Sequence, residues 1–390
     1  MKGVISIFFL FAFFEYTKAQ IAEIPFELHE SLILIKVFVN DQTNANTFIL
    51  DTGATTDLID RNTAEKLGLK SNYKQDVTGA GGIKSYDIIL SQKLRLNNAI
   101  NVEESHLVLT DLSPLQKRFE KEFDGIVGYS LLKQYIVKID YENQKIIFFD
   151  KFHDLNLEDY HPIPFEFANG IPIPQFDVVM KLKSGDSFTG RILFDSGAGL
   201  TLLVNTPYHE THGIRKKVDT YLVNESENLS GTSKSERIAI SSLKIGAFEL
   251  GEMVVDLAYD NEGVSSYKDY LGILGAEVIG RFNIVFDYSN FKLYLKPNAF
   301  YNDSFSFPVS GIRLIKENDD VVIHSVDNGC YAHKKGIREG DKLIAVNNDH
   351  SKDIHVYRHY LSLENSIATL TVMNSKGKKR SVKIRLKRLL

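Results

Sequence analysis

The sequence predicts a mainly β protein in which two similar lobes are followed by a small α+β domain. Short runs of Ile, Val, Phe, Tyr and Leu alternate with Asn, Asp, Gly and Ser through most of the chain, as is typical of strands and turns. A series of motifs occurs twice, in the same order, between residues 25 and 298. The composition then changes over 297–308, where a third region begins. A chain of 390 residues is long enough for two or three such domains.

The N-terminus has the pattern of a secretory signal peptide. Lys2 precedes an apolar run over 4–14, and Thr17-Lys18-Ala19 supplies a cleavage site with a small residue. The run is about half of the ~20 residues that a spanning helix needs, so we expect removal of 1–19 and no transmembrane span afterwards. An uncleaved membrane anchor is the alternative. The chain has one cysteine, Cys330, and therefore no intrachain disulfide, which favours a bacterial periplasmic or secreted setting.

The repeated unit begins with an Asp on a tight glycine turn at the end of an apolar run. A single Asp on a glycine turn is an ordinary surface feature. Two such turns with matched surroundings predict two carboxyl groups brought face to face. Such a pair cannot easily ionise twice, so it shares one proton, and one group acts as base while the other acts as acid. The two copies are Phe48-Ile49-Leu50-Asp51-Thr52-Gly53-Ala54 and Ile192-Leu193-Phe194-Asp195-Ser196-Gly197-Ala198.

The duplication continues well beyond these triplets. Gly128 closes an apolar run 77 residues after Asp51, and Gly275 closes one 80 residues after Asp195. Each is followed by a short helix-like piece, a strand that ends in Asp-Tyr, a polar turn and another strand. A repeat of this length indicates two similar lobes rather than a short-period solenoid.

These motifs resemble those of the aspartic peptidases over about residues 25–298. The two-lobed single chain is similar to pepsin, and the Ala after each Asp-(Thr/Ser)-Gly is similar to retropepsins. The resemblance implies that Asp51 and Asp195 form a catalytic dyad that activates water against a peptide bond. It also implies that two hydroxyl groups hold the loops in register across the lobe junction, while glycines let backbone approach the carboxyl groups or pass behind the loops. These supporting residues are Thr52, Ser196, Gly53, Gly197, Gly128 and Gly275.

The family also uses a mobile hairpin over the cleft. Gly79-Ala80-Gly81-Gly82 lies where a retropepsin-like flap is expected, and its glycines supply hinge freedom. The alternative is a flexible hairpin tip without that role. Tyr86 is a candidate for the flap tyrosine of pepsins. In the second lobe only Ser230-Gly231 interrupts the polar stretch 224–237, so we expect the cleft to be covered from one side.

The C-terminal region resembles a PDZ domain of the bacterial type over about 305–390. Such domains bind an extended peptide, often through its C-terminal carboxylate, by adding a strand to a sheet edge. The carboxylate loop is expected at Gly311, Ile312, Arg313 and Leu314. Arg313 replaces a usual Gly, so it either blocks this loop or pairs with the carboxylate; a domain that only packs against the peptidase is the alternative. The motifs are 321–323, Gly329-Cys330-Tyr331-Ala332, Lys335-Gly336-Ile337, Gly340-Asp341 and Val346-Asn347-Asn348.

Together these patterns predict an exported aspartic endopeptidase that cleaves an extended polypeptide and carries a peptide-binding PDZ domain. The rival hypothesis is a non-catalytic peptide-binding protein on the same scaffold. We expect no cofactor and no metal, because the sequence has neither a His/Cys/Glu cluster with metal spacing nor a phosphate-binding loop. We expect no nucleic-acid partner for an exported chain. The predicted division is a signal peptide at 1–19, lobes at 20–154 and 155–298, and the PDZ domain at 299–390.

Overall fold

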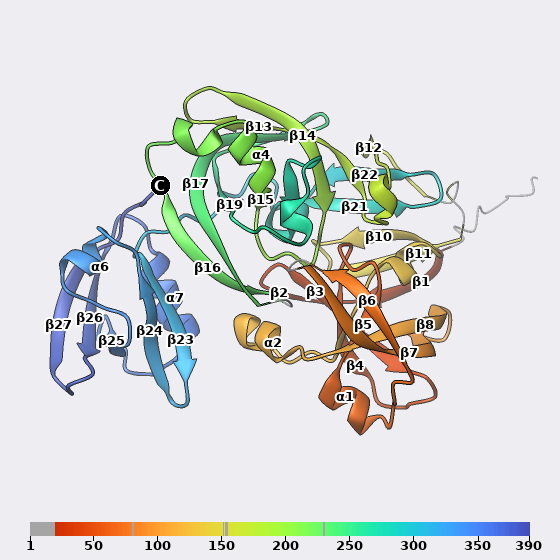
Figure 1. Ribbon diagram of the computed structural model, residues 1–390, viewed down its shortest axis with the longest axis horizontal. Helices are drawn as coiled ribbons and strands as arrows, with labels where there is room; N and C mark the ends of the chain where they lie inside the picture. Colours follow the sequence, from red (N-terminus) through yellow and green to blue (C-terminus); the bar gives the residue numbers. More distant parts are fainter. Residues whose placement is uncertain (1–19, 80–81, 151, 153–154, 229–230) are drawn as a thin grey trace, which may run out of the picture.

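The computed structural model describes residues 20–79, 82–150, 152, 155–228 and 231–390, so the predicted signal peptide lies outside the described residues. The fold is mainly β, as predicted, with two eight-stranded sheets, one six-stranded sheet and one five-stranded sheet. Figure 1 shows the first lobe in red to orange, the second in green, and the C-terminal domain in blue at one side.

The first lobe is built on an eight-stranded sheet with three short helices. Its strands in spatial order are β2 (Glu27–His29), β3 (Leu32–Val39), β4 (Asn46–Leu50), β9 (Gly125–Val127), β5 (Asp57–Asp60), β8 (Asn101–Thr110), β7 (Gly82–Arg95) and β6 (Tyr73–Gly79). The helices are α1 (Arg61–Lys66), α2 (Ser113–Phe119) and α3 (Tyr129–Leu132).

The second lobe repeats this plan. Its strands in order are β13 (Gln175–Leu182), β14 (Ser187–Phe194), β20 (Gly272–Leu274), β15 (Leu202–Val204), β19 (Met253–Ala258), β17 (Gly231–Ile245) and β16 (Leu222–Asn228), with β18 (Phe248–Leu250) paired to β17. Its helices are α4 (Thr206–Thr211) and α5 (Ala276–Ile279), with single 3-10 turns at η2 (Ala168–Gly170), η3 (Ile214–Lys217) and η4 (Val264–Ser266). In both lobes the strand before the Asp loop runs parallel to the strand before the closing glycine: β4 with β9, and β14 with β20.

A six-stranded sheet joins the two lobes. Its order is β1 (Gln20–Pro25), β11 (Lys145–Phe149), β10 (Ile136–Asp140), β21 (Phe282–Asp287), β22 (Lys292–Pro297) and β12 (His161–Pro164). The two strands that end in Asp-Tyr are neighbours at its centre, where Ile139 lies opposite Ile284. Both side chains are fully buried in a core that extends through both lobes. Burial of this apolar surface is the main force that holds the lobes together.

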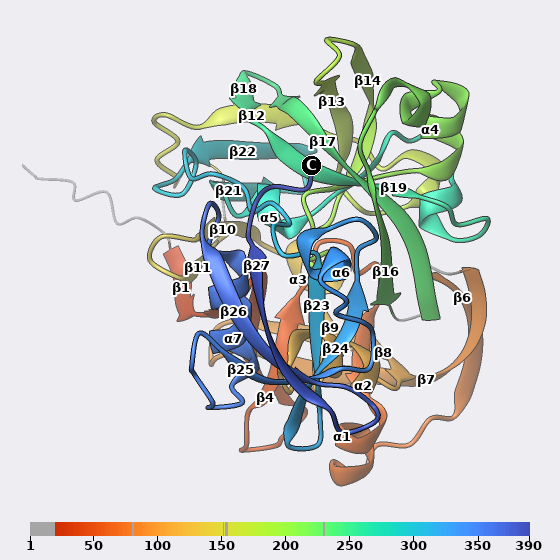
Figure 2. The ribbon, with the colours of Figure 1, turned by 90° about the vertical axis from the view of Figure 1, so that its left-hand side faces the viewer.

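The C-terminal domain has its own core. Its sheet order is β23 (Ile312–Glu317), β24 (Asp320–Val326), β25 (Lys342–Val346), β26 (Ile367–Met373) and β27 (Lys379–Arg385), with α6 (Tyr331–Lys334) and α7 (Ile354–Ser362) beside it. Leu343, Leu370 and Ile384 are buried in a cluster separate from that of the lobes. Figure 2 views this domain in front of the two lobes.

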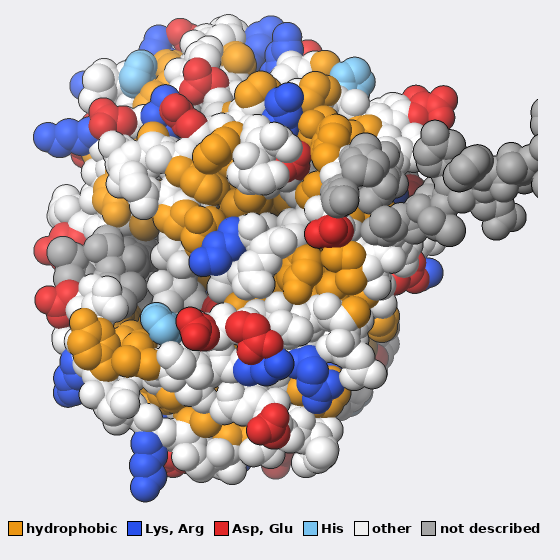
Figure 3. Space-filling view, turned by 90° about the vertical axis from the view of Figure 1, so that its right-hand side faces the viewer, with side chains coloured by type: hydrophobic (Ala, Val, Ile, Leu, Met, Phe, Trp, Pro, Cys, Tyr) orange, Lys and Arg blue, Asp and Glu red, His pale blue; other side chains and the backbone are white. Residues whose placement is uncertain are grey.

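The outer surface mixes side-chain types. On the face away from the C-terminal domain, acidic and basic side chains are interspersed with hydrophobic ones (Figure 3). Among the residues that the structure describes, no helix is both long and apolar enough to cross a membrane.

Candidate active site

Matching strand ends position Asp51 and Asp195. Asp51 follows β4, and its backbone N–H donates to the Val127 carbonyl oxygen of β9 at 2.9 Å. Asp195 follows β14, and its N–H donates to the Leu274 carbonyl oxygen of β20 at 3.0 Å. Because each Asp leaves a parallel strand pair at the same point, the duplicated sheets present the two loops to each other in the same way.

The structure brings the two carboxyl groups together. Asp51 Oδ1 accepts the N–H of Gly53 at 2.7 Å and that of Gly197, from the opposite lobe, at 3.2 Å. Asp195 Oδ1 accepts the N–H of Gly197 at 2.9 Å and that of Ala198 at 3.0 Å. One N–H group, that of Gly197, is therefore within hydrogen-bond distance of both carboxyl groups.

Space explains why a glycine follows each Asp-(Thr/Ser) pair. A Cβ atom added to Gly53 lies 2.5 Å from Asp195 Cγ, and one added to Gly197 overlaps the Asp51 carboxyl group. Real Cβ contacts are never this short, so any side chain here pushes the two carboxyl groups apart. The repeat therefore requires Gly at both positions.

Two further glycines let the chain pass behind the loops. A Cβ atom at Gly128 lies 2.5 Å from the Ala54 carbonyl oxygen, and one at Gly275 lies 2.7 Å from that of Ala198. The residues that follow these glycines donate their N–H groups to the same two carbonyl oxygens, at 3.0 and 2.8 Å. The back of each Asp loop is therefore fixed by a segment that a larger residue would displace.

Thr52 and Ser196 connect the loops across the lobe junction. Each backbone N–H donates to the hydroxyl oxygen of the other residue, at 3.0 Å for Thr52 and 2.9 Å for Ser196. The Thr52 hydroxyl donates to the Phe194 carbonyl oxygen at 2.7 Å, and the Ser196 hydroxyl donates to the Leu50 carbonyl oxygen at 3.3 Å. Both side chains are buried. Four such hydrogen bonds, each worth about 0.5–1.5 kcal/mol, hold the loops in one register.

Burial and mutual repulsion set the protonation of the pair. Burial raises the pKa of Asp51, although the surrounding N–H groups partly oppose this. Burial raises the pKa of Asp195 well above its ordinary value, and the negative charge of Asp51 and a hydrogen bond with it raise that pKa further. The pair therefore retains one proton when isolated carboxyl groups have lost theirs.

The first lobe carries the predicted glycine-rich hairpin. Strands β6 and β7 pair up to Gly79 opposite Gly82; Ala80 and Gly81 lie outside the described residues. Tyr86 lies on β7 opposite Gln75. These positions agree with a hairpin, while the flap role stays a prediction.

The second lobe also has a long hairpin, while the expectation that the cleft is covered from one side stays a prediction. In the second lobe, β16 and β17 form a long hairpin whose last described pair is Asn228 opposite Gly231. Strand β16 extends from the second lobe to α2 of the first lobe (Figure 1). Sequence analysis missed it because the stretch is polar and has no cluster of glycines.

A buried carboxyl group behind the first loop was also missed. Asp57 accepts the Ser105 hydroxyl at 2.5 Å, the Ser130 hydroxyl at 2.6 Å and the Gly128 N–H at 3.2 Å, and burial raises its pKa. Asp57 lies six positions after Asp51, and the residue at the same distance after Asp195 is Thr201, whose hydroxyl donates to a backbone carbonyl oxygen. An alignment of the two repeats pairs Asp57 with Thr201, and this matched position is the sequence signal that could have identified Asp57.

The predicted carboxylate loop of the C-terminal domain lies beside the second lobe. Gly311 has a positive φ of 68°, and its carbonyl oxygen accepts the Asp327 N–H at 2.8 Å. Ile312 packs against the domain core, and Leu314 is buried in it. Arg313 is oriented toward β16, where it donates to the Asn224 side chain and to the Val223 carbonyl oxygen at 3.4 Å. Arg313 was expected either to block the carboxylate loop or to pair with a peptide carboxylate, and neither expectation includes this contact between domains.

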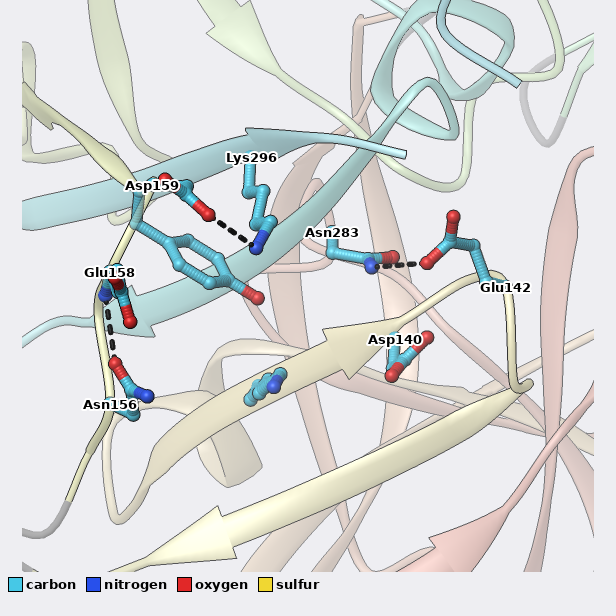
Figure 4. Close-up of a pocket in the computed structure, with 9 residues that line it drawn as sticks. Asp140, Glu142, Asn156, Glu158, Asp159, Asn283 and Lys296 are labelled. Carbon is cyan, nitrogen blue, oxygen red and sulfur yellow. Dashed lines mark hydrogen bonds and ion pairs between the residues drawn. The ribbon is translucent and has the colours of Figure 1, made fainter. Parts of the chain in front are cut away.

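A charged cavity of about 370 Å³ lies on the sheet that joins the lobes (Figure 4), and neither dyad residue lines it. Its side chains pair with one another: Lys296 Nζ lies 3.1 Å from an Asp159 oxygen, and Asn283 donates to Glu142 at 3.2 Å. Within the described part of the chain, no group of three or more His, Cys, Asp and Glu side chains is arranged to hold a metal ion.

Comparison with known families identifies two regions of the chain. Residues 35–131 match the aspartyl protease family, and residues 309–373 match the PDZ domain family. The first match contains Asp51, Gly128 and the glycine-rich hairpin. A search of curated proteins finds no significant match. The chain therefore contains an aspartyl protease domain and a C-terminal PDZ domain, as the motifs predicted, with a second β lobe between them.

Proposed function

We propose that this protein is an exported aspartic endopeptidase in which Asp51 and Asp195 activate a water molecule. The observation that carries the proposal is the pair of half-buried carboxyl groups, from two duplicated loops, that contact the same Gly197 N–H. The aspartyl protease match over 35–131 supports the reaction class. Export rests on the signal-like pattern of residues 1–19.

In the mechanism that we propose, one carboxyl group of the pair starts protonated and the other starts ionised. Protonated Asp195 donates a hydrogen bond to the scissile carbonyl oxygen, while ionised Asp51 accepts a proton from water. The water oxygen bonds to the carbonyl carbon and forms a tetrahedral diol, and the proton of Asp195 moves to the carbonyl oxygen. When the C–N bond breaks, the proton held by Asp51 moves to the leaving nitrogen, and a diol proton returns to Asp195. Because no bond to the enzyme forms, both products leave as free peptides.

The substrate is an extended polypeptide that lies across both lobes. Hairpins from the two lobes, β6–β7 and β16–β17, provide strand edges along which its backbone pairs. The PDZ domain supplies a second peptide-binding edge on the same molecule.

Incubation with a diverse peptide library across pH, followed by mass spectrometry, tests this function. We expect internal cleavage of extended peptides that a statine-type inhibitor abolishes. If the protein retains library peptides without cutting them at any pH, it is a peptide-binding protein instead. The complete dyad argues against that alternative, because loss of one Asp is enough to end this chemistry.

A further inference from the structure

The peptide-binding edge of the PDZ domain is already engaged by the protein itself. Strand β23 is the edge strand of its sheet, and α7 packs beside it. From α7, Arg358 Nη2 donates to the Leu314 carbonyl oxygen of β23 at 3.0 Å. A peptide that adds a strand to β23 has to pair with the outward backbone groups of this edge. Arg358 therefore occupies the Leu314 carbonyl oxygen, an acceptor with which such a peptide would have to pair.

The same arginine attaches the PDZ domain to the first lobe. Arg358 Nη2 lies 2.8 Å from Glu120 Oε1, and His355 Nε2, one turn earlier on α7, lies 3.2 Å from Glu120 Oε2. Glu120 caps the C-terminal end of α2 with a φ of 51° and is only 20% exposed. One carboxylate thus receives both side chains of α7, and one guanidinium group joins the peptide-binding edge to the peptidase.

A second contact attaches the PDZ domain to the other lobe. Arg313 of β23 donates to the Asn224 side chain and the Val223 carbonyl oxygen of β16, while its Nε donates to Ser325 at 2.6 Å. The Asn224 amide donates to Asp256 at 3.3 Å and to Ser235 at 3.2 Å, so the contact continues into the base of the hairpin. Since Asn224 is buried, this network fixes the direction of β16.

These contacts meet at the hairpin of the second lobe. Strand β16 lies between α2, which carries Glu120 at its end, and β23, which carries Arg313 (Figure 1). In many enzymes a hairpin or loop beside the active site moves when substrate enters. Movement of the β16–β17 hairpin away from α2 and β23 requires the PDZ contacts to separate.

We propose that an extended peptide adding to β23 displaces Arg358 from Leu314, weakens the docking of the PDZ domain on Glu120 and Asn224, and so frees the β16–β17 hairpin for substrate entry. Part of this inference rests on the proposed peptidase function, but binding and docking are measurable without catalysis. The coupling is reciprocal: docking weakens peptide binding by the same factor by which bound peptide weakens docking, typically about 5–150-fold.

Binding to an immobilised array of ten-residue peptides, with free C-terminal carboxylates and matched C-terminal amides, tests the first step. We compare full-length Asp195→Asn, which leaves array peptides uncut, with the same protein also carrying Arg358→Met or Glu120→Gln. Arg338→Met is the control, since the Arg338 side chain donates to the His333 and Ile337 carbonyl oxygens within the PDZ domain itself. We expect Arg358→Met and Glu120→Gln to bind the array peptides at least about 5-fold more tightly, with the control unchanged. Equal binding by all proteins, or no binding by any, overturns the proposal.

Hydrogen exchange with the best-bound array peptide tests the second step. In the Asp195→Asn protein, we expect the peptide to speed exchange over 222–228 of β16 and to leave β26 unaffected. If the peptide binds and exchange over 222–228 does not change, binding and docking are independent and the inference fails. If the wild type cuts no peptide while exchange responds, the peptidase function fails and the coupling stands.

Discussion

The two lobes have the same loop geometry but different supports. In both, Asp leaves a parallel strand pair, and a glycine, a cross-lobe hydroxyl group and a closing glycine surround it. Behind the first loop, however, stands the buried carboxyl group of Asp57, whereas Thr201 supplies a neutral hydroxyl group behind the second. The hairpin of the second lobe contacts the PDZ domain through Asn224. The duplication is therefore kept in the two Asp loops and is lost in the residues behind them.

Replacement of either dyad residue tests the part that is symmetric. We expect Asp51→Asn and Asp195→Asn each to lower kcat/KM by about 10²–10⁴-fold or more, because an amide of nearly the same shape cannot exchange the proton. Circular dichroism and thermal unfolding should show that both variants stay folded. Turnover near the wild-type rate in either variant would show that this Asp is not required, and it would rule out a shared-proton pair.

Replacement of Gly53 and Gly197 tests whether the two lobes enclose the carboxyl groups equally. Gly53→Ala and Gly197→Ala both place a Cβ atom against the carboxyl group of the other lobe, so we expect loss of most activity and destabilisation by about 1–3 kcal/mol. Gly251→Ala is the control, because nothing lies within 4 Å of its added Cβ atom. Urea unfolding and peptide hydrolysis measure both effects. If one glycine tolerates Ala, the two carboxyl groups are not equally enclosed.

A pH series tests the part that is not symmetric. Burial raises the folded pKa of Asp57 above that of an ordinary Asp, so its stabilising contribution is present below the ordinary pKa and is lost as pH rises through the folded pKa. The destabilisation caused by Asp57→Asn should therefore be greatest at low pH and decrease as pH rises. Thr201→Val should cost about 1–3 kcal/mol at every pH, because it leaves a carbonyl acceptor unpaired. Parallel pH dependences for the two variants contradict this difference between the lobes.

The Ala that follows each Asp triplet is expected to have the smallest effect. Pepsins commonly have a hydroxyl residue there that stabilises the carboxylate and lowers its pKa; Ala54 and Ala198 cannot do so. Cleavage should therefore be fastest at a less acidic pH than in digestive pepsins. Ala54→Ser and Ala198→Ser should shift the pH–rate profile toward acid. A wild-type optimum below about pH 3, or no shift in either variant, contradicts this explanation.

The features that sequence analysis predicted depend on local patterns. Asp51, Asp195 and their glycines were found because a carboxyl group, a hydroxyl group and an open backbone occur within three adjacent residues, twice. The glycine-rich hairpin and the PDZ domain were also recognisable from short motifs in order. The boundaries of the domains and the catalytic roles of these residues stay predictions.

The features that sequence analysis missed depend on residues far apart in the chain. In the sequence, nothing distinguishes Asp57 from other polar residues. Its role depends on Ser105 and Ser130, 48 and 73 positions away, whose hydroxyl groups donate to it. In the sequence, Arg313 is a substitution in a carboxylate loop. In the structure its guanidinium group donates a hydrogen bond to Asn224, 89 positions earlier. The hairpin of the second lobe has a polar sequence, and its contacts with α2 and the PDZ domain join residues far apart in the chain. In each case tertiary contacts, not local propensity, decide the role.

Titration of the dyad by carboxyl-¹³C NMR, in wild type and Asp51→Asn, most directly tests whether carboxyl groups from two lobes share one proton. We predict that wild-type Asp195 titrates well above an ordinary Asp, and that Asp51→Asn lowers its pKa, because the neighbouring negative charge is gone while burial remains. An Asp195 titration that is unchanged in Asp51→Asn contradicts the account, since the two groups would then ionise independently.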